Sequence, residues 1–196
     1  MYNYNNSKSR VMSTVSIMGA ISFIIMFISV PLPFMPSFLK LDFSEIPAII
    51  TSFALGPIPG LCVVLVKNII HLLFTSTGGV GEIANFLIGA SFVLTAGFIY
   101  KKNKTKKGAM ISFLISIFCM TIVGAVLNYY LLLPIYTLIT PLSSSIISIC
   151  KSINPNINSL LDIVYIFIIP FNLIKGFCIS FITFILYKKL SPIIKE

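Results

Sequence analysis

The sequence predicts an all-α integral membrane protein, a six-transmembrane-helix bundle. Of its 196 residues, 57% are hydrophobic and only 10% are charged, and the mean hydropathy is +1.03. A soluble domain carries about 25% charged residues, because its surface faces water. The apolar residues also fall in long runs, and a helix that crosses the hydrocarbon core needs about 20 of them. These observations exclude an ordinary soluble enzyme.

We expect one membrane domain over residues 1–196, with helices at about 11–30, 44–55, 58–74, 82–100, 109–136 and 163–187. The first run follows a basic tail but precedes no small-residue cleavage site, which favours a retained span over a signal peptide. The second is short for a span, with Ser44 as a candidate N-cap and Pro47 in its first turn. A glycine-rich turn precedes the fourth helix, and we expect residues 140–162, rich in Ser, Asn and Pro, to form an outer loop.

The charges orient the chain. It has 14 Lys and Arg against 5 Asp and Glu, a formal charge of +9. With six crossings, both termini share one side with the lysine-rich run 101–107, and cytoplasmic segments carry the excess of Lys and Arg. The sequence therefore predicts both termini inside, and the basic run is a topology signal rather than a nucleic-acid site.

Polar side chains inside the predicted spans indicate an outward-facing ligand cavity. Such groups are costly in a membrane and usually face the bundle interior. Five of them can converge near the outer side: Glu82, Asn85, Asn128, Asn172 and Lys175. Three others fit a helix–helix hydrogen bond or a snorkelling lysine as well as a ligand contact: Lys67, Asn68 and His71.

The chemistry of these groups limits the ligand. Amides that donate and accept, one ammonium and one carboxylate suit a neutral, flat heteroaromatic ring with carbonyls and a hydroxylated chain. The segment Gly78–Gly81 lacks the Lys-Ser/Thr of a phosphate-binding loop, and the cysteines show no metal spacing. We therefore expect no metal, no cofactor and no ATP site, so that active transport would take its energy from other chains.

Several segments resemble the riboflavin-specific substrate-binding subunit of energy-coupling factor (ECF) transporters: 39–47, 53–57, 67–74, 78–86, 127–130 and 170–176. The resemblance implies a subunit, not an enzyme, in the plasma membrane of a prokaryote. It also implies that riboflavin binds from outside, and that a transmembrane coupling subunit and two cytoplasmic ATPases act as partners.

The resemblance further implies roles for individual residues. The flavin ring edge would be held by Asn128, Asn172 and Lys175. The ribityl chain would meet Glu82, Asn85 and the backbone of Gly79 and Gly81, and the loop at Leu41 and Phe43 would close over the ligand.

A small-residue seam on the first helix is the coupling contact that the resemblance implies. Here Ser16 and Ala20 have the required spacing, with Gly19 beside them. Small residues permit close helix approach in lipid, so packing within the bundle is the alternative interpretation. Two alternatives to the function stay open: the same architecture for another vitamin, such as thiamine or pantothenate, and a small membrane enzyme acting on a lipid or quinone.

Overall fold

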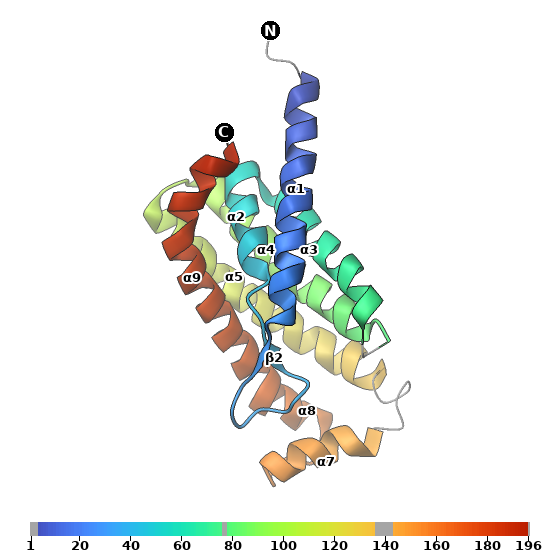
Figure 1. Cartoon of the computed structure of the whole chain (residues 1–196). Helices are drawn as coiled ribbons and strands as arrows, with labels where there is room; N and C mark the ends of the chain where they lie inside the picture. The colour runs from blue at the N-terminus through green and yellow to red at the C-terminus, as the bar shows by residue number, and fades with distance from the viewer. Residues whose placement is uncertain (1–3, 76–77, 136–142, 196) are drawn as a thin grey trace.

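The structure, a computed structural model, describes residues 4–75, 78–135 and 143–195. Its long helices run beside one another as a bundle, and the start of α1 lies at the same end as the finish of α9 (Figure 1). The helices of the described residues are α1 (Tyr4–Phe27), α2 (Glu45–Leu55), α3 (Pro57–His71), α4 (Val80–Lys102), α5 (Lys106–Leu127), α7 (Ser143–Ile153), α8 (Leu160–Ile163) and α9 (Ile169–Lys195).

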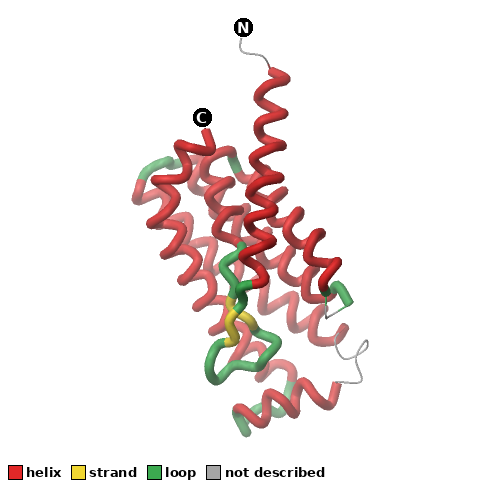
Figure 2. Tube along the Cα trace, viewed as in Figure 1, coloured by secondary structure: helices red, strands yellow, loops and turns green. Residues whose placement is uncertain are grey.

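Shorter elements complete the chain. A 3-10 turn, η1 (Leu72–Phe74), extends α3; the π-helical segments η2 (Asn128–Leu132) and η3 (Val164–Ile168) continue α5 and join α8 to α9. The loop between α1 and α2, residues 28–44, contains two short strands, β1 (Val30–Pro31) and β2 (Lys40–Leu41). They pair antiparallel, with Val30 opposite Leu41, and are the strands drawn in Figure 2.

Five segments of the described residues are long and apolar enough to cross a membrane: Lys8–Phe27, Pro57–Phe74, Val80–Lys102, Lys106–Ile135 and Leu160–Lys189. The predicted helical architecture, with several helices able to cross a membrane, is thereby confirmed. The predicted helix 44–55 corresponds to α2, which has 11 residues and is about 16 Å long at 1.5 Å per residue. The count of six spans and the inside position of both termini stay predictions, and Tyr136, the predicted end of the fifth helix, lies outside the described residues.

Helix α2 is the centre of the bundle although it is shorter than the five membrane-capable segments. Its residues from Glu45 to Phe53 are buried, and it packs against α1, α3, α4 and α9. The ring of Phe53 stacks on Tyr100 with centroids 4.0 Å apart. Because other helices surround α2, its apolar side chains are buried in protein. It therefore does not need the length of a helix that faces lipid across the whole membrane.

Local sequence explains where the helices begin. Gly56 has φ +113° and Gly79 has φ +90°, a backbone region that favours glycine, and these residues precede α3 and α4. The hydroxyl of Thr105 accepts a hydrogen bond from the Gly108 N–H and caps α5. The expected cap by Ser44 was wrong: its side chain makes no cap at α2, because its hydroxyl is bonded to Asp42 and Lys67 instead.

The segment 140–162, expected as an outer loop, contains helix α7 and the start of α8, which the sequence analysis did not predict; residues 140–142 lie outside the described part of the chain. Helix α7 lies across the end of the bundle opposite the start of α1 (Figure 1). Ile146 and Cys150 are buried, one helical turn apart, in a cluster with η3. Burial raises the pKa of the Cys150 thiol to about 11, in keeping with a structural core position.

Candidate ligand-binding site

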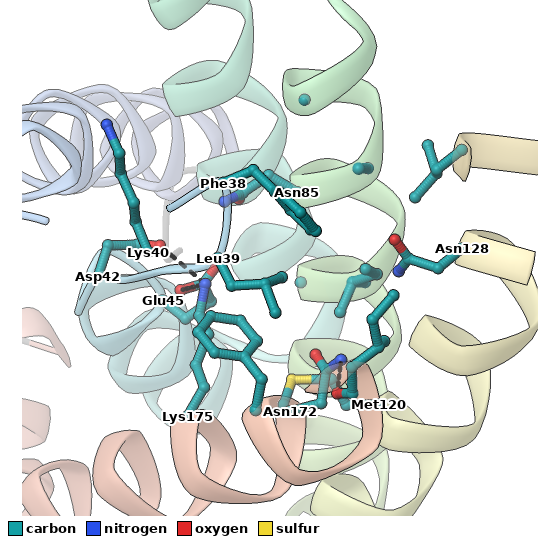
Figure 3. A pocket seen from close by; sticks show the side chains of 17 residues that line it. Phe38, Leu39, Lys40, Asp42, Glu45, Asn85, Met120, Asn128, Asn172 and Lys175 are labelled. Carbon is teal, nitrogen blue, oxygen red and sulfur yellow. Dashed lines mark hydrogen bonds and ion pairs between the residues drawn. The ribbon is translucent and has the colours of Figure 1, made fainter. Parts of the chain in front are cut away.

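A cavity of about 150 Å³ lies between the 28–44 loop and helices α2, α4, α5 and α9. Figure 3 shows Asn128 on one side of it and Lys175 on the other. Its lining combines apolar side chains with amides and charged groups: Phe38, Leu39, Lys40, Asp42, Glu45, Gly81, Ala84, Asn85, Ile88, Gly89, Met120, Asn128, Leu132, Ile168, Phe171, Asn172 and Lys175. This is the composition of a small-molecule site, largely apolar with a few placed polar groups.

Two asparagines reach the cavity from different helices. Asn128, at the start of η2, donates through Nδ2 to the Gly124 carbonyl oxygen at 2.7 Å. Asn172 of α9 donates to the Ile168 carbonyl oxygen at 2.9 Å. Each bond runs one turn back along the same chain and orients the amide, while using only one of its two N–H groups. The two amides are thus held at the cavity by their own helices.

Lys175 is paired with two carboxylates inside the bundle. Its Nζ lies 2.8 Å from Asp42 Oδ2 and 3.5 Å from Glu45 Oε2, and its side chain is 10% exposed. Burial alone would raise the pKa of the Asp42 carboxyl, but the nearby ammonium groups of Lys175 and Lys67 hold it well below its usual range. Figure 3 shows Asp42, Glu45 and Lys175 gathered together, whereas the Lys40 side chain extends away from them.

Lys67 is also part of this cluster, although sequence reasoning left its role open. Its Nζ donates to Glu45 Oε1 at 2.8 Å and to the hydroxyl of Ser44, and its side chain is fully buried. Ser44 in turn donates to Asp42. Five side chains therefore form a closed ion-pair ring: Asp42, Ser44, Glu45, Lys67 and Lys175.

Asn85 and Gly81 line the same cavity from the first turns of α4. The Asn85 side-chain oxygen is buried, and it has no hydrogen-bond partner in the described part of the chain. Buried polar atoms are nearly always hydrogen-bonded. An acceptor in this state beside a cavity fits a donor group supplied by a ligand.

Glu82 and Gly79 lie outside the lining of this cavity. The Glu82 carboxylate is bonded through Oε1 to His71 Nδ1 and through Oε2 to the Thr75 hydroxyl, both at 2.8 Å. The Gly79 N–H donates to the Thr75 hydroxyl at 3.1 Å. These bonds join the end of α3 and Thr75 to the start of α4, where Gly81 lines the cavity.

The 28–44 loop contributes different side chains from those that the resemblance implied. Leu41 is buried and Phe43 packs against the main core, while Asp42 between them lines the cavity. Successive side chains in extended backbone point to opposite sides, which separates these neighbours. Sequence reasoning missed Asp42 and Glu45 as site residues, although a buried lysine needs a counter-ion and the chain has only five acidic residues to supply one.

The three residues proposed for the coupling seam lie on different faces of α1. Ser16 and Ala20 are exposed. Gly19 is buried against α3, where an added Cβ would lie 2.6 Å from Val66 Cγ1. Ser16 and Ala20 are therefore available to a partner, whereas Gly19 serves packing within the bundle.

Residues 10–187 of the chain match the protein family described as the ECF transporter, substrate-specific component. The chain belongs to this family. A solved structure, the S component of a bacterial ECF transporter, superposes with a TM-score of 0.78 at 38% identity, covering 96% of this chain and 99% of that one. The fold is therefore that of an ECF S component.

Two curated relatives of this S component span nearly its whole length. The riboflavin transporter RibU of Staphylococcus aureus is 40% identical over 192 residues, covering 98% of this chain and 96% of the relative. The riboflavin transporter FmnP of Bacillus subtilis is 36% identical over 194 residues, covering 96% of each. Both are named as transporters, and the expectation that the chain is not an enzyme is confirmed.

Proposed function

We propose that this S component binds riboflavin and delivers it inward as part of an ATP-driven ECF importer in the plasma membrane of a prokaryote. The observation that carries the proposal is the meeting of Asn128, Asn172 and Lys175 at one cavity. Two relatives named riboflavin transporters, similar over nearly the whole chain, support the choice of ligand.

The proposed contacts follow from hydrogen-bonding capacity. The pyrimidine edge of the flavin ring alternates carbonyl, N–H and carbonyl. An asparagine amide can meet the N–H and one carbonyl together, and an ammonium can donate to a carbonyl or ring nitrogen. Asn128, Asn172 and Lys175 would hold this edge, and Asn85 with the Gly81 backbone would meet the ribityl chain.

We propose indirect roles for the predicted contact residues that do not line the cavity. Glu82 and Gly79 would act through the turn that carries Gly81, because their polar groups are bonded to His71 and Thr75. Leu41 and Phe43 would anchor the 28–44 loop in the bundle. Phe38 and Leu39, which line the cavity, would be the side chains that close over the ligand.

Ligand entry requires this loop to move. The cavity of about 150 Å³ is smaller than the roughly 300–1,000 Å³ of typical small-molecule pockets. Phe38 is already 41% exposed, so displacing the loop tip breaks little packing. We assign the loop the role of a lid on the outer side.

Titration of the purified protein with riboflavin, followed by quenching of flavin fluorescence, tests the ligand. We expect saturable binding that excess thiamine or pantothenate does not compete away. Binding of thiamine or pantothenate without riboflavin would support the alternative of another vitamin. A protein that takes up no riboflavin would overturn the proposal.

Uptake of labelled riboflavin by cells tests the coupling to ATP. Cells that contain the chain together with a transmembrane coupling subunit and two ATPases should accumulate riboflavin. Cells with the chain alone should bind it without accumulation. Equal accumulation in both would remove the ATP-driven module from the proposal.

A further inference from the structure

The ion-pair ring has a member that does not reach the ligand cavity. Lys67 is 0% exposed and is absent from the cavity lining, yet it is bonded to Glu45 and Ser44. Burying a charged lysine destabilises the fold unless the ammonium is paired with a carboxylate and hydrogen-bonded. Because Lys67 does not line the cavity, it can affect a ligand only indirectly, through its effect on residues that do.

The ring balances two cations against two carboxylates. Glu45 divides its oxygens: Oε1 accepts from Lys67 at 2.8 Å, and Oε2 lies 3.5 Å from Lys175. Asp42 is likewise shared, because Oδ1 accepts from Ser44 and Oδ2 accepts from Lys175 at 2.8 Å. Lys67 therefore neutralises part of the negative charge of the two carboxylates, which Lys175 would otherwise have to balance alone.

We propose that Lys67 is a positioning residue for ligand binding, which acts by drawing Glu45 away from Lys175 so that the Lys175 ammonium keeps a hydrogen-bond donor for the ligand. This inference rests on the proposed function. The ammonium has three N–H donors, and the strong contact in the ring is the one to Asp42. The longer distance to Glu45 leaves donor capacity toward the cavity.

The ring also explains how one helix can influence another across the bundle. Its members come from the 28–44 loop, α2, α3 and α9. Lys67 on α3 is connected to Lys175 on α9 by two routes, one through Glu45 and one through Ser44 and Asp42. Gly89 of α4 leaves room for this arrangement, since a Cβ there would lie 3.1 Å from Glu45 Oε1. The carboxylate of Glu45 is thus held closely from several sides.

Lys67→Met tests the inference, because methionine keeps much of the side-chain length but removes the charge. Asp42 and Glu45 would then share the single ammonium of Lys175. We expect riboflavin affinity to fall roughly 10- to 100-fold, the equivalent of one charge-assisted hydrogen bond. Unchanged affinity in a folded Lys67→Met protein would overturn the proposal.

The double variant Lys67→Met with Glu45→Gln provides the decisive comparison. It removes one charge of each sign and leaves the Lys175–Asp42 pair intact, so affinity should return to within about threefold of the wild type. A purely structural role for the two residues predicts that the losses add, and a double variant weaker than Lys67→Met would overturn the proposal. If Lys67→Met does not fold, a loss of more than about tenfold in the affinity of the double variant would likewise overturn it.

Thr51→Val is the matched control. Thr51 is also 0% exposed, its hydroxyl is bonded to the Pro47 carbonyl oxygen within α2, and it is outside the ring. We expect a lower melting temperature with unchanged affinity. If the wild type itself binds no riboflavin, the proposed function fails; if it binds and the double variant is not rescued, only this inference fails.

Discussion

At the scale of single residues, the site depends on groups that are oriented before a ligand arrives. Asn128 and Asn172 are each tied to a carbonyl oxygen of the preceding turn, and Lys175 is tied to Asp42. Such preorganisation reduces the ordering cost of binding. In the proposed site the same bonds would limit ligand contact, because Lys175 would donate to both Asp42 and the ligand.

Replacing Lys175 by Met should weaken riboflavin binding by roughly 10- to 100-fold, since one charge-assisted hydrogen bond to the ring edge is lost. The matched control is Lys40→Met, because Lys40 also lines the cavity but its side chain extends away from the ion-pair ring (Figure 3). Fluorescence titration of both variants measures the difference. Equal riboflavin affinities of the two variants would show that Lys175 does not contact the ligand.

Gly124 brings α5 close to the Asn172 amide. A Cβ at this position would lie 2.9 Å from Asn172 Nδ2, so Gly124→Ala should rotate that amide away from its orientation. Because an amide at the end of a side chain can move, we expect little change in melting temperature. The displaced amide would lose a hydrogen bond to the ligand, and affinity should fall by the equivalent of about 1–3 kcal/mol. Titration and thermal unfolding of the same preparation measure both quantities.

Gly97→Ala is the contrasting control for that experiment. Its Cβ would lie 3.1 Å from the Pro57 backbone and would also meet the Ser52 side chain. Gly97 is absent from the cavity lining, and backbone cannot move aside as an amide can. This variant should melt at a lower temperature and keep its affinity; the opposite pattern in the two variants would contradict the assignment of Gly124.

At the scale of elements, helix α1 has a buried face and an exposed face. Gly19 packs on Val66 of α3, and Ser22 donates to the Ser44 carbonyl oxygen at 2.7 Å. Ser16 and Ala20 are exposed on the remaining surface of the helix. One helix thus joins an inner packing face to an outer face suited to a partner helix.

Leucine substitutions at adjacent positions separate these two faces. Gly19→Leu should collide with Val66 and lower the melting temperature, at a cost of about 1–3 kcal/mol or more for overpacking. Ala20→Leu should keep both melting temperature and riboflavin affinity but stop uptake in cells that contain the coupling module. Normal uptake by Ala20→Leu would exclude this face of α1 from the coupling contact.

At the scale of the whole molecule, sequence patterns predicted what depends on local composition. Apolar runs and the Gly, Pro and Lys residues between them located the helices that are long enough to cross a membrane. Polar residues in those runs pointed to Asn128, Asn172 and Lys175, which line one cavity. Helix α7 was missed because its serines suggested a loop, although Ile146, Cys150 and Ile153 have helical spacing.

The ion-pair ring could not be predicted in this way. Asp42 and Lys175 are 133 residues apart in sequence, and their contact depends on how α9 and the 28–44 loop pack. Spacing along the chain carries no information about such a pair. Charge balance does carry information, because two lysines inside an apolar bundle require acidic partners. Glu45 is the first residue of the buried helix α2, and Asp42 lies three residues before it.

The two ends of the bundle differ in charge, which predicts how the whole molecule lies in the membrane. The turn between α4 and α5, in the middle of the lysine-rich run 101–107, lies at the same end as the start of α1 and the finish of α9, while α7 lies at the other end (Figure 1). Since cytoplasmic segments carry the excess of Lys and Arg, the lysine-rich end should face the cytoplasm and α7 the outside.

Cysteines introduced at Lys104 and Asn156, both exposed, would report the two ends. A membrane-impermeant thiol reagent applied to intact cells should label the Asn156→Cys protein and reach the Lys104→Cys protein only after permeabilisation. The wild type sets the background, because its four cysteines are at least partly buried. Labelling of Lys104→Cys in intact cells would reverse the orientation, and would place the proposed riboflavin cavity on the cytoplasmic side.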